Sequence, residues 1–248
     1  MFQRLIPNPA AGLSASEVAS GLGFADRAPA DRPYLALNMA ATADGRVSIG
    51  GRSAPVAGAA DRELFHELRT QADAVMAGAG TARVERYRRV TKDESLRERR
   101  VRAGVLPDGV MVLVSGSLDL PSDLPVLGDA ASRVVIVTAS NSRLEGVAAE
   151  VSYIRQPRDR ALAGALRTLR QEHGIRSVLC EGGPHLNSEL FRGGLVDELF
   201  LCVSPRIAGE PSEPASLEGI ALPAPVDLDL ISLHEAEDHL FFRYGVRR

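Results

Sequence analysis

The sequence predicts an α/β fold with a mostly parallel central sheet, an antiparallel C-terminal edge and helices on both faces. Three observations support this prediction. Short apolar runs alternate with segments whose apolar residues recur at helical spacing, which is typical of a parallel sheet covered by helices. Two of these runs end in glycine-rich turns, where a strand commonly gives way to a helix. The final third of the chain is rich in strand-like runs, which favours antiparallel pairing there.

The composition narrows the functional classes. The chain has 248 residues, of which 45% are apolar and 25% charged, and these are ordinary values for a globular protein. Its net charge of −3 gives no basic excess for nucleic acid. No apolar run approaches the roughly 20 residues of a membrane helix, and the N-terminus has no apolar signal-peptide region. We therefore expect a cytoplasmic protein with neither nucleic-acid nor membrane partners.

The two cysteines, Cys180 and Cys202, both lie inside apolar, strand-like runs. This placement predicts reduced thiols in the core of a cytosolic protein. A zinc site needs more ligands at closer spacing, so no metal is expected.

The N-terminal part divides into an arm and the start of one domain. Residues 1–32 are rich in Ala, Gly, Ser and Pro, which predicts a loosely attached arm with one short helix near Ser14–Ser20. Nothing marks a boundary inside residues 33–248, so we expect a single domain there. Its first elements are a strand over 33–45, a helix over 61–73 with one apolar face, and a buried strand over 74–81 that runs into a glycine turn.

The rest of the chain continues the alternation. The charged segment 86–102 predicts a solvated loop or helix, with a substrate-phosphate role for one arginine as the alternative. Helices are expected over residues 160–172 and 183–192. Further strands are expected over residues 110–116, 133–139, 150–155, 175–180, 196–204 and 239–246.

The stretch CEGGPHL, residues 180–186, predicts an anion site. Gly182 and Gly183 permit close backbone approach and positive φ, and Pro184 suits the first helical turn. The N–H groups at that helix start attract phosphate or pyrophosphate. The stretch AVMAGAGTAR, residues 74–83, repeats the design with Thr81 as a plausible N-cap. Neither stretch fits G-x-G-x-x-G, so an ordinary Rossmann site is not supported, and a purely structural glycine turn remains an alternative.

Three stretches, RPYLALNMAATADGRVS, LRTQADAVMAGAGTARVE and VLCEGGPHLNSELFRGGLVDELFLCVSPRIAG, carry a family resemblance. In this order they resemble the C-terminal reductase domain of the bacterial riboflavin-biosynthesis deaminase–reductase, whose fold is like that of dihydrofolate reductase. The resemblance covers roughly residues 33–246. It implies NADPH as cofactor, a homodimer, and hydride transfer to the sugar C1 of a phosphorylated ribosylaminouracil. The zinc deaminase pattern with its C-x-x-C pair is absent, so a reductase without the deaminase is expected.

The resemblance also implies roles for individual residues. Ser53 and Arg69 match positions that hold the substrate phosphate, and Glu181 matches a substrate-contacting acid. The positions that match cofactor contacts are Ala40, Thr42, Asp44, Gly80, Thr81, Ser115, Gly182, Gly183, Pro184, His185 and Leu186.

Three positions depart from the family pattern, and one of them is Asn38, which stands where many bacterial members have lysine and others have Asn. Glu85 stands at the first acid of a D-D-P segment that is otherwise replaced, and we predict that Glu85 orients or supplies a proton. Asp119 stands where the family often has an arginine for the adenosine 2′-phosphate, and its charge would repel that phosphate.

Two other functions remain open at this point. The fold also permits reduction of a pterin or folate, and a requirement for substrate phosphate would favour the uracil compound instead. The altered segment around Glu85 also permits a nicotinamide-nucleotide-binding protein without turnover.

Overall fold

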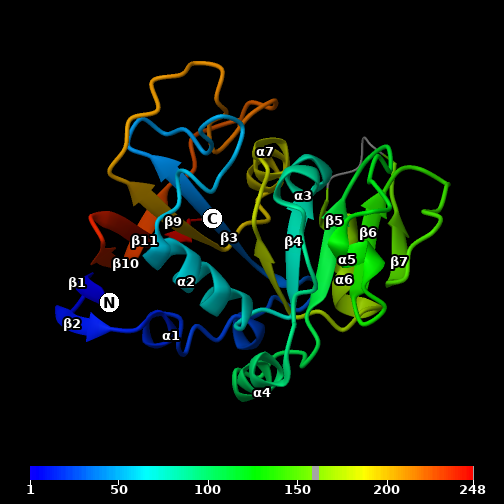
Figure 1. Ribbon diagram of the computed structural model, residues 1–248, viewed down its shortest axis with the longest axis horizontal. Coiled ribbons are helices and arrows are strands. Elements are labelled where there is room, and N and C mark those ends of the chain that lie inside the picture. The colour runs from blue at the N-terminus through cyan, green and yellow to red at the C-terminus, as the bar shows by residue number, and fades with distance from the viewer. Residues whose placement is uncertain (158–161, 248) are drawn as a thin grey trace.

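The computed structural model describes residues 1–157 and 162–247, and its strands form a single sheet (Figure 1). In spatial order the strands are β2 (Ala10–Leu13), β1 (Phe2–Ile6), β10 (Leu228–Ala236), β11 (His239–Val246), β9 (Glu198–Ser204), β3 (Tyr34–Thr42), β8 (Ser177–Cys180), β4 (Ala74–Gly78), β5 (Val110–Val114), β6 (Arg133–Thr138) and β7 (Glu150–Arg155). Neighbouring strands from β9 to β7 are parallel, whereas β11, β10, β1 and β2 pair antiparallel. The predicted fold class is therefore confirmed.

Helices cover both faces of the sheet. They are α1 (Ala15–Val18), α2 (Ala59–Arg69), α3 (Ala79–Glu85), α4 (Glu94–Arg102), α5 (Pro125–Gly128), α6 (Ala163–Gln171) and α7 (Pro184–Arg192). Successive side chains of a strand point to opposite faces, so Met76 of β4 joins the core with α6 and α7, while Val75 and Ala77 join the core with α3 and α5. The helix predicted over 160–172 begins at Ala163, and residues 160 and 161 lie outside the described residues.

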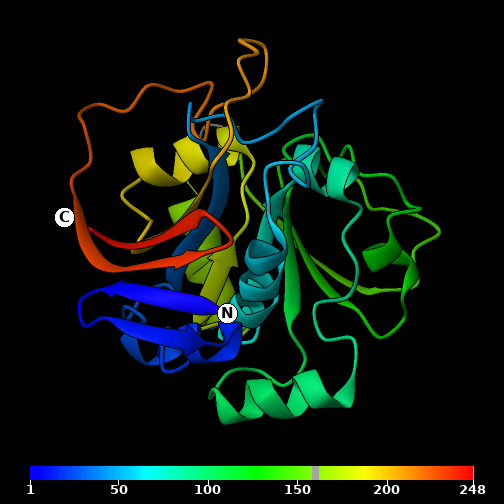
Figure 2. The same ribbon diagram turned by 60° about the vertical axis from the view of Figure 1, so that its left-hand side comes forward.

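The N-terminal segment is built into the sheet, so the expectation of a loose arm over residues 1–32 is corrected. β1 pairs with β10, and Figure 2 shows this N-terminal hairpin beside the β10–β11 hairpin. The Phe2 side chain is fully buried, and its ring meets that of Phe241 edge-on at 5.1 Å. The expected short helix is α1, and Ser14 and Glu17 form a capping box at its N-terminus.

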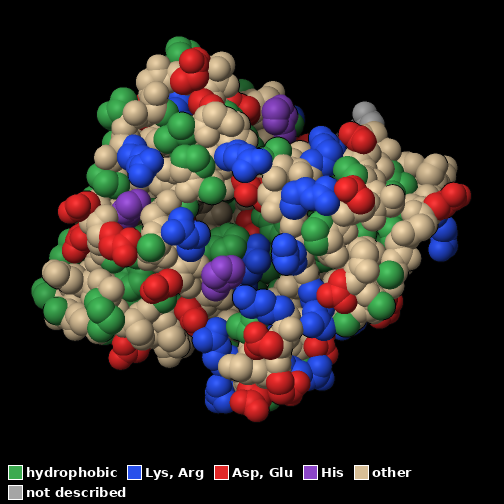
Figure 3. Space-filling model, in the orientation of Figure 1, with side chains coloured by type: hydrophobic (Ala, Val, Ile, Leu, Met, Phe, Trp, Pro, Cys, Tyr) green, Lys and Arg blue, Asp and Glu red, His purple; other side chains and the backbone are tan. Residues whose placement is uncertain are grey.

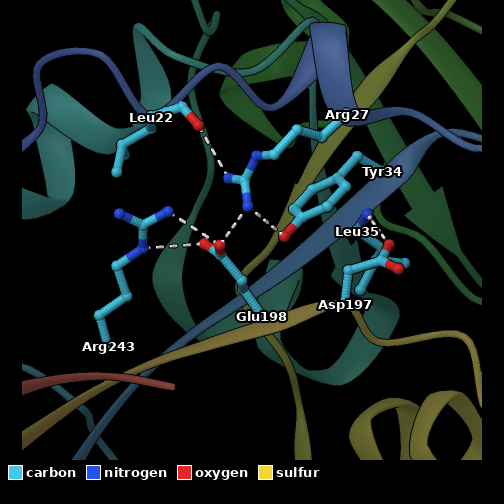
Figure 4. Close-up of polar contacts among 7 residues, drawn as sticks. All are labelled: Leu22, Arg27, Tyr34, Leu35, Asp197, Glu198 and Arg243. Carbon is cyan, nitrogen blue, oxygen red and sulfur yellow. Dashed lines mark hydrogen bonds and ion pairs between the residues drawn. The ribbon is translucent and has the colours of Figure 1, made fainter. Parts of the chain in front are cut away.

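A buried ion cluster fastens the same segment to the parallel strands (Figure 4). Arg27, in a short 3₁₀ turn, donates to Glu198 Oε1 at 2.5 Å and to the Tyr34 hydroxyl at 2.8 Å. Arg243 of β11 donates to both oxygens of Glu198, at 3.1 and 2.8 Å. Two arginines from separate segments therefore share one carboxylate that is 1% exposed.

The charged segment 86–102 contains α4, but its prediction as a solvated element is wrong for one arginine. The Arg100 side chain is buried, and its guanidinium donates to the carbonyls of Leu106, Arg69 and Asp73. Burial lowers the pKa of Arg100 to about 10, which still leaves it charged at neutral pH. The side chain thus joins α4 to the end of α2 and to the strand that follows it.

Candidate active site

The carboxyl ends of β3, β8, β4 and β5 open onto a cavity of about 1230 Å³. Parts of α2, α3 and α7 complete its lining. In Figure 3 a hollow lies near the centre of the face, and Lys and Arg side chains gather around it. Ligands of open α/β sheets bind at this edge, and the volume is large enough for a cofactor together with a small substrate.

Most residues singled out from the sequence meet at this cavity. Those that line it are Ala40, Ser53, Arg69, Gly80, Thr81, Glu85, Ser115, Glu181, Gly183, Pro184, His185 and Leu186. Thr42, Asp44 and Gly182 do not line it.

The glycine turn after β8 packs directly against the start of α3. Gly182 has a φ of 85° and a cis peptide bond to Gly183, and its carbonyl accepts a hydrogen bond from the Gly78 N–H at 2.8 Å. A Cβ on Gly183 would lie only 2.7 Å from Thr81 Oγ1, so a larger residue does not fit there. The two glycine-rich turns found separately in the sequence therefore form one unit.

The residues around this turn fit a diphosphate group. No side chain caps the first turn of α7, so its N–H groups remain available to an anion. A Cβ on Gly80 would meet no neighbouring atom within 4 Å, so the backbone there faces open space in the cavity. The predicted N-cap role of Thr81 is wrong, because α3 begins earlier with Gly78 as its N-cap.

Arg69, Glu181 and Tyr87 form a compact network at the inner wall. Arg69 Nε and one terminal nitrogen donate to the two Glu181 oxygens, each at 2.7 Å. The Tyr87 hydroxyl donates to Glu181 Oε2, also at 2.7 Å. Burial raises the pKa of Tyr87 well above its ordinary value, so the phenol keeps its proton. Glu181 therefore has a fixed orientation, and two of the three guanidinium nitrogens of Arg69 are already engaged.

Ser53 and Glu85 meet at the cavity mouth. The Ser53 hydroxyl donates to Glu85 Oε1 at 2.6 Å, and the Ser53 N–H lies 3.3 Å from the same oxygen. Both residues are exposed. The contact places the predicted proton-handling carboxylate beside a residue matched to substrate phosphate.

Thr42 and Asp44 fix the loop behind the cavity. The Thr42 hydroxyl donates to Asp44 Oδ1 at 2.5 Å, and Asp44 also accepts the N–H groups of Ala208 and Gly209 at 3.0 Å. The hydrogen bond from Thr42, followed by those two backbone bonds, holds the pKa of Asp44 below its usual range. Both residues thereby tie the loop after β3 to the loop after β9.

Two further cations line the cavity that were not singled out individually in the sequence. Arg88 and Lys92 form no ion pair within residues 1–157 and 162–247. Burial, and then the positive charges of Arg69 and Lys92, lower the pKa of His66 on the same wall. The sequence signal was the charged segment 86–102, which indicates cations but not which of them face inward.

Some features are absent from the described part of the chain. No cluster of three or more His, Cys, Asp or Glu side chains there could hold a metal ion. None of its helices combines the length and apolar character needed to cross a membrane. Cys180 and Cys202 are buried and free, and burial raises the pKa of Cys180 to about 12.

Comparison with known proteins identifies relatives of this chain. The family model of the RibD C-terminal domain matches residues 33–241. A 2,5-diamino-6-ribosylamino-4(3H)-pyrimidinone 5′-phosphate reductase from Methanothermobacter thermautotrophicus is 30% identical over 226 residues, covering 87% of this chain and 99% of that protein. The protein of the same name from Archaeoglobus fulgidus is 31% identical over 193 residues, covering 76% of this chain and 87% of that one.

Solved structures share the fold. A pyrimidine reductase-like protein from Corynebacterium diphtheriae superposes with a TM-score of 0.79 at 22% identity, covering 95% of this chain and all of that one (100%). The riboflavin biosynthesis reductase Rib7 of Saccharomyces cerevisiae gives a TM-score of 0.64 at 17% identity, covering 88% and 92%. With the family match across most of its length and the cavity in the expected place, this chain belongs to the RibD C-terminal domain family.

Proposed function

We propose that this protein is an NADPH-dependent reductase that transfers a hydride to a phosphoribosylaminopyrimidine of riboflavin biosynthesis. The observation that carries the proposal is the cavity itself. It joins an uncapped helix start beside a glycine turn with a buried carboxylate and with unpaired cations. The archaeal relatives named as pyrimidinone 5′-phosphate reductases give the reaction class.

The cofactor end of the proposed site follows from the glycine turn. When bound, NADPH supplies the hydride, and the protein supplies orientation and charge. The first turn of α7, including His185 and Leu186, holds the diphosphate together with the backbone at Gly80. Ala40 lies on the cavity wall and would back the nicotinamide, while Thr42 and Asp44 hold the loop that follows β3.

The substrate end lies at the inner wall. Glu181 contacts the pyrimidine, because its carboxylate faces the cavity in the one orientation that Arg69 and Tyr87 allow. The substrate phosphate needs cations that are not already neutralised. Lys92 and Arg88 meet that need, with Ser53 as a hydroxyl donor and the remaining Arg69 nitrogen as a further contact.

Reduction of the sugar requires a proton as well as a hydride, and we assign its handling to Glu85. The Glu85 carboxylate lines the cavity and is positioned by the Ser53 hydroxyl at 2.6 Å. It is exposed, so a proton can also reach the reacting oxygen or nitrogen through water.

The proposal includes a homodimer in the cytoplasm. Two buried free cysteines suit a reducing compartment. An apolar stripe runs across β9, β11 and β10, since Phe242 lies opposite Leu201 and Tyr244 lies opposite Leu199 in register. These side chains are only half-buried within one chain, which favours a second copy as their partner.

The test compares substrates with and without the 5′-phosphate while following NADPH oxidation. We expect turnover of the phosphorylated ribosylaminopyrimidine and, for the dephosphorylated compound, a KM raised by at least about tenfold, because charge-assisted contacts are lost. The Lys92→Ala variant should raise KM for the phosphorylated compound alone. Absence of turnover with any ribosylaminopyrimidine would exclude the proposed function.

A pterin or dihydrofolate reductase is the second candidate, and one observation favours it. Arg69, matched to a phosphate-binding position, has two of its nitrogens bound to Glu181, and a buried acid is a suitable partner for the ring nitrogens of a pterin. Turnover of dihydrofolate that is insensitive to Lys92→Ala would select this candidate over the first.

A further inference from the structure

A loop after β5 lines one part of the cavity and carries a serine whose hydroxyl has no partner among the described residues. Ser115 is 4% exposed and lines the cavity, and its hydroxyl forms no hydrogen bond with any residue that the structure describes. Gly116, Ser117 and Asp119 line the same end. Because this hydroxyl has no protein partner there and Ser115 lines the cavity, it is free to donate to a ligand.

Arg83 of α3 reaches across to this loop. One terminal nitrogen donates to the Asp119 carbonyl at 2.7 Å and to Asp119 Oδ2 at 3.0 Å. The two side chains stay accessible, at 40% and 74% exposed, and both line the cavity. The Nε and the second terminal nitrogen of Arg83 have no acceptor within the described part of the chain, so they can bind an anion without breaking the pair.

The family resemblance already implies that the segment around Asp119 lies at the adenosine 2′-phosphate, and the position of this end within the cavity agrees with it. If the diphosphate lies at α7 and the substrate at Glu181, the adenosine half of the cofactor occupies the end at β5, with β4 between β8 and β5. Proteins distinguish the two nicotinamide cofactors at the adenosine ribose, where an acid accepts from the 2′-hydroxyl and an arginine holds the 2′-phosphate. This chain has one residue of each kind at that end, Asp119 and Arg83, and the two form an ion pair.

We propose that Arg83 is the residue that selects a 2′-phosphorylated dinucleotide, with the Ser115 hydroxyl as a second donor. The inference rests on the proposed function. Asp119, expected from the sequence to repel the phosphate, is neutralised by Arg83 and instead holds the guanidinium at the cavity edge. The selecting cation therefore comes from α3 and not from the loop itself.

A neighbouring pair provides a matched control. Arg86 donates to the Asp123 carboxylate and to the Asp123 carbonyl, each at 3.0 Å, so it fastens the end of α3 to the same loop. Asp123 does not line the cavity. Arg86 itself lines the cavity, so Arg86→Ala removes the same charge from the same cavity and the same kind of loop contact as Arg83→Ala, but it leaves the pair of Arg83 with Asp119 in place.

The experiment measures dissociation constants of NADP⁺ and NAD⁺ by calorimetry, without turnover. We expect Arg83→Ala to weaken NADP⁺ roughly 10- to 100-fold, as expected for hydrogen bonds to a charged group, and to change NAD⁺ by less than about twofold. Arg86→Ala should leave the ratio of the two constants within about twofold. Arg83→Lys keeps the charge but loses the planar guanidinium, so its dissociation constant for NADP⁺ should lie between those of the wild type and Arg83→Ala. This variant replaces Arg83→Ala in the comparison if the alanine variant does not fold.

The outcomes separate the two levels of the proposal. If the wild-type protein binds neither nucleotide, the proposed function fails. If it binds NADP⁺ but Arg83→Ala weakens both nucleotides equally, or no more than Arg86→Ala does, the role of Arg83 is overturned and the proposed function stands. A wild-type preference for NAD⁺ that Asp119→Asn abolishes would assign the site to the ribose 2′-hydroxyl and also overturn the inference.

Discussion

Tyr87 and Arg69 hold the Glu181 carboxylate from two sides before any ligand binds. Tyr87 belongs to the segment that replaces the family's D-D-P sequence, so the replacement adds a hydrogen-bond donor to the inner wall. Because three donors share two oxygens, rotation of the carboxylate would break at least one charge-assisted bond. Glu181 is therefore preorganised in one orientation for the substrate contact that we propose.

Glu85 is the single residue on which the proposed proton transfer depends. Glu85→Gln keeps an oxygen that can accept the Ser53 hydrogen bond but cannot carry a proton. We expect kcat to fall by about 100-fold, within the range for general acid–base catalysis. The measurement is the pH profile of kcat, with Glu63→Gln as control, because Glu63 is also exposed and does not line the cavity. An unchanged profile in the Glu85 variant would remove this residue from the mechanism.

Sequence reasoning could predict the glycine turn, because its signal is local. Gly182, Gly183 and Pro184 are adjacent, and each has a conformational meaning of its own. The pairing of Arg69 with Glu181 could not be predicted, since these residues lie far apart in the chain and matched two separate substrate roles. Only the packing of α2 against the end of β8 brings their charges together.

At the level of elements, the antiparallel edge was the hardest part to predict. β10 alternates apolar and polar residues only in part and contains a register shift, so its period-2 signal is weak. β1 and β2 are short and lie among turn-forming residues. The composition of residues 1–32 therefore resembles that of a loosely attached arm. Parallel strands such as β4 and β5 were predicted because strands buried on both faces are continuous apolar runs.

The ion cluster at Glu198 determines how firmly the N-terminal segment is held. Arg27→Ala removes one of two arginines from this carboxylate, and we expect the free energy of unfolding, measured in urea, to fall by about 1–2 kcal/mol. The loss stays this small because Arg27 is partly exposed and Arg243 remains. Arg167→Ala on α6 is the control, since Arg167 is exposed and forms no ion pair among the described residues. Equal stability of the two variants would show that the cluster contributes little.

The same cluster predicts a pH dependence of stability. Burial alone would raise the pKa of Glu198, but hydrogen bonds from Arg243 and Arg27 outweigh it and hold the pKa below 4.5. The stability that Glu198 contributes is thus fully present above about pH 4.5 and is lost as pH falls through the folded-state value. In Arg27→Ala the acid unfolding midpoint should move to higher pH.

For the whole molecule, the proposed dimer face determines the oligomeric state. The apolar stripe lies on the antiparallel strands, where the rings of Phe242 and Tyr244 stack at 5.5 Å. Phe242→Glu would place a charge on both sides of a two-fold interface, so we expect the mass measured by light scattering to fall to that of one chain. Val101→Glu on α4, also a change at an exposed apolar residue, should leave the mass unchanged. A wild-type monomer would contradict the proposal.

The pairing of β1 with β10 has a consequence for how the polypeptide reaches its final form. Gln3 finds its partner only at Glu235, near the other end of the chain. During synthesis on the ribosome, β1 can pair with β2 at once, but the hairpin they form has no strand of the sheet to join until β10 has been added. The parallel strands around β8 can assemble earlier, and attachment of the N-terminal hairpin then becomes a late step in biogenesis.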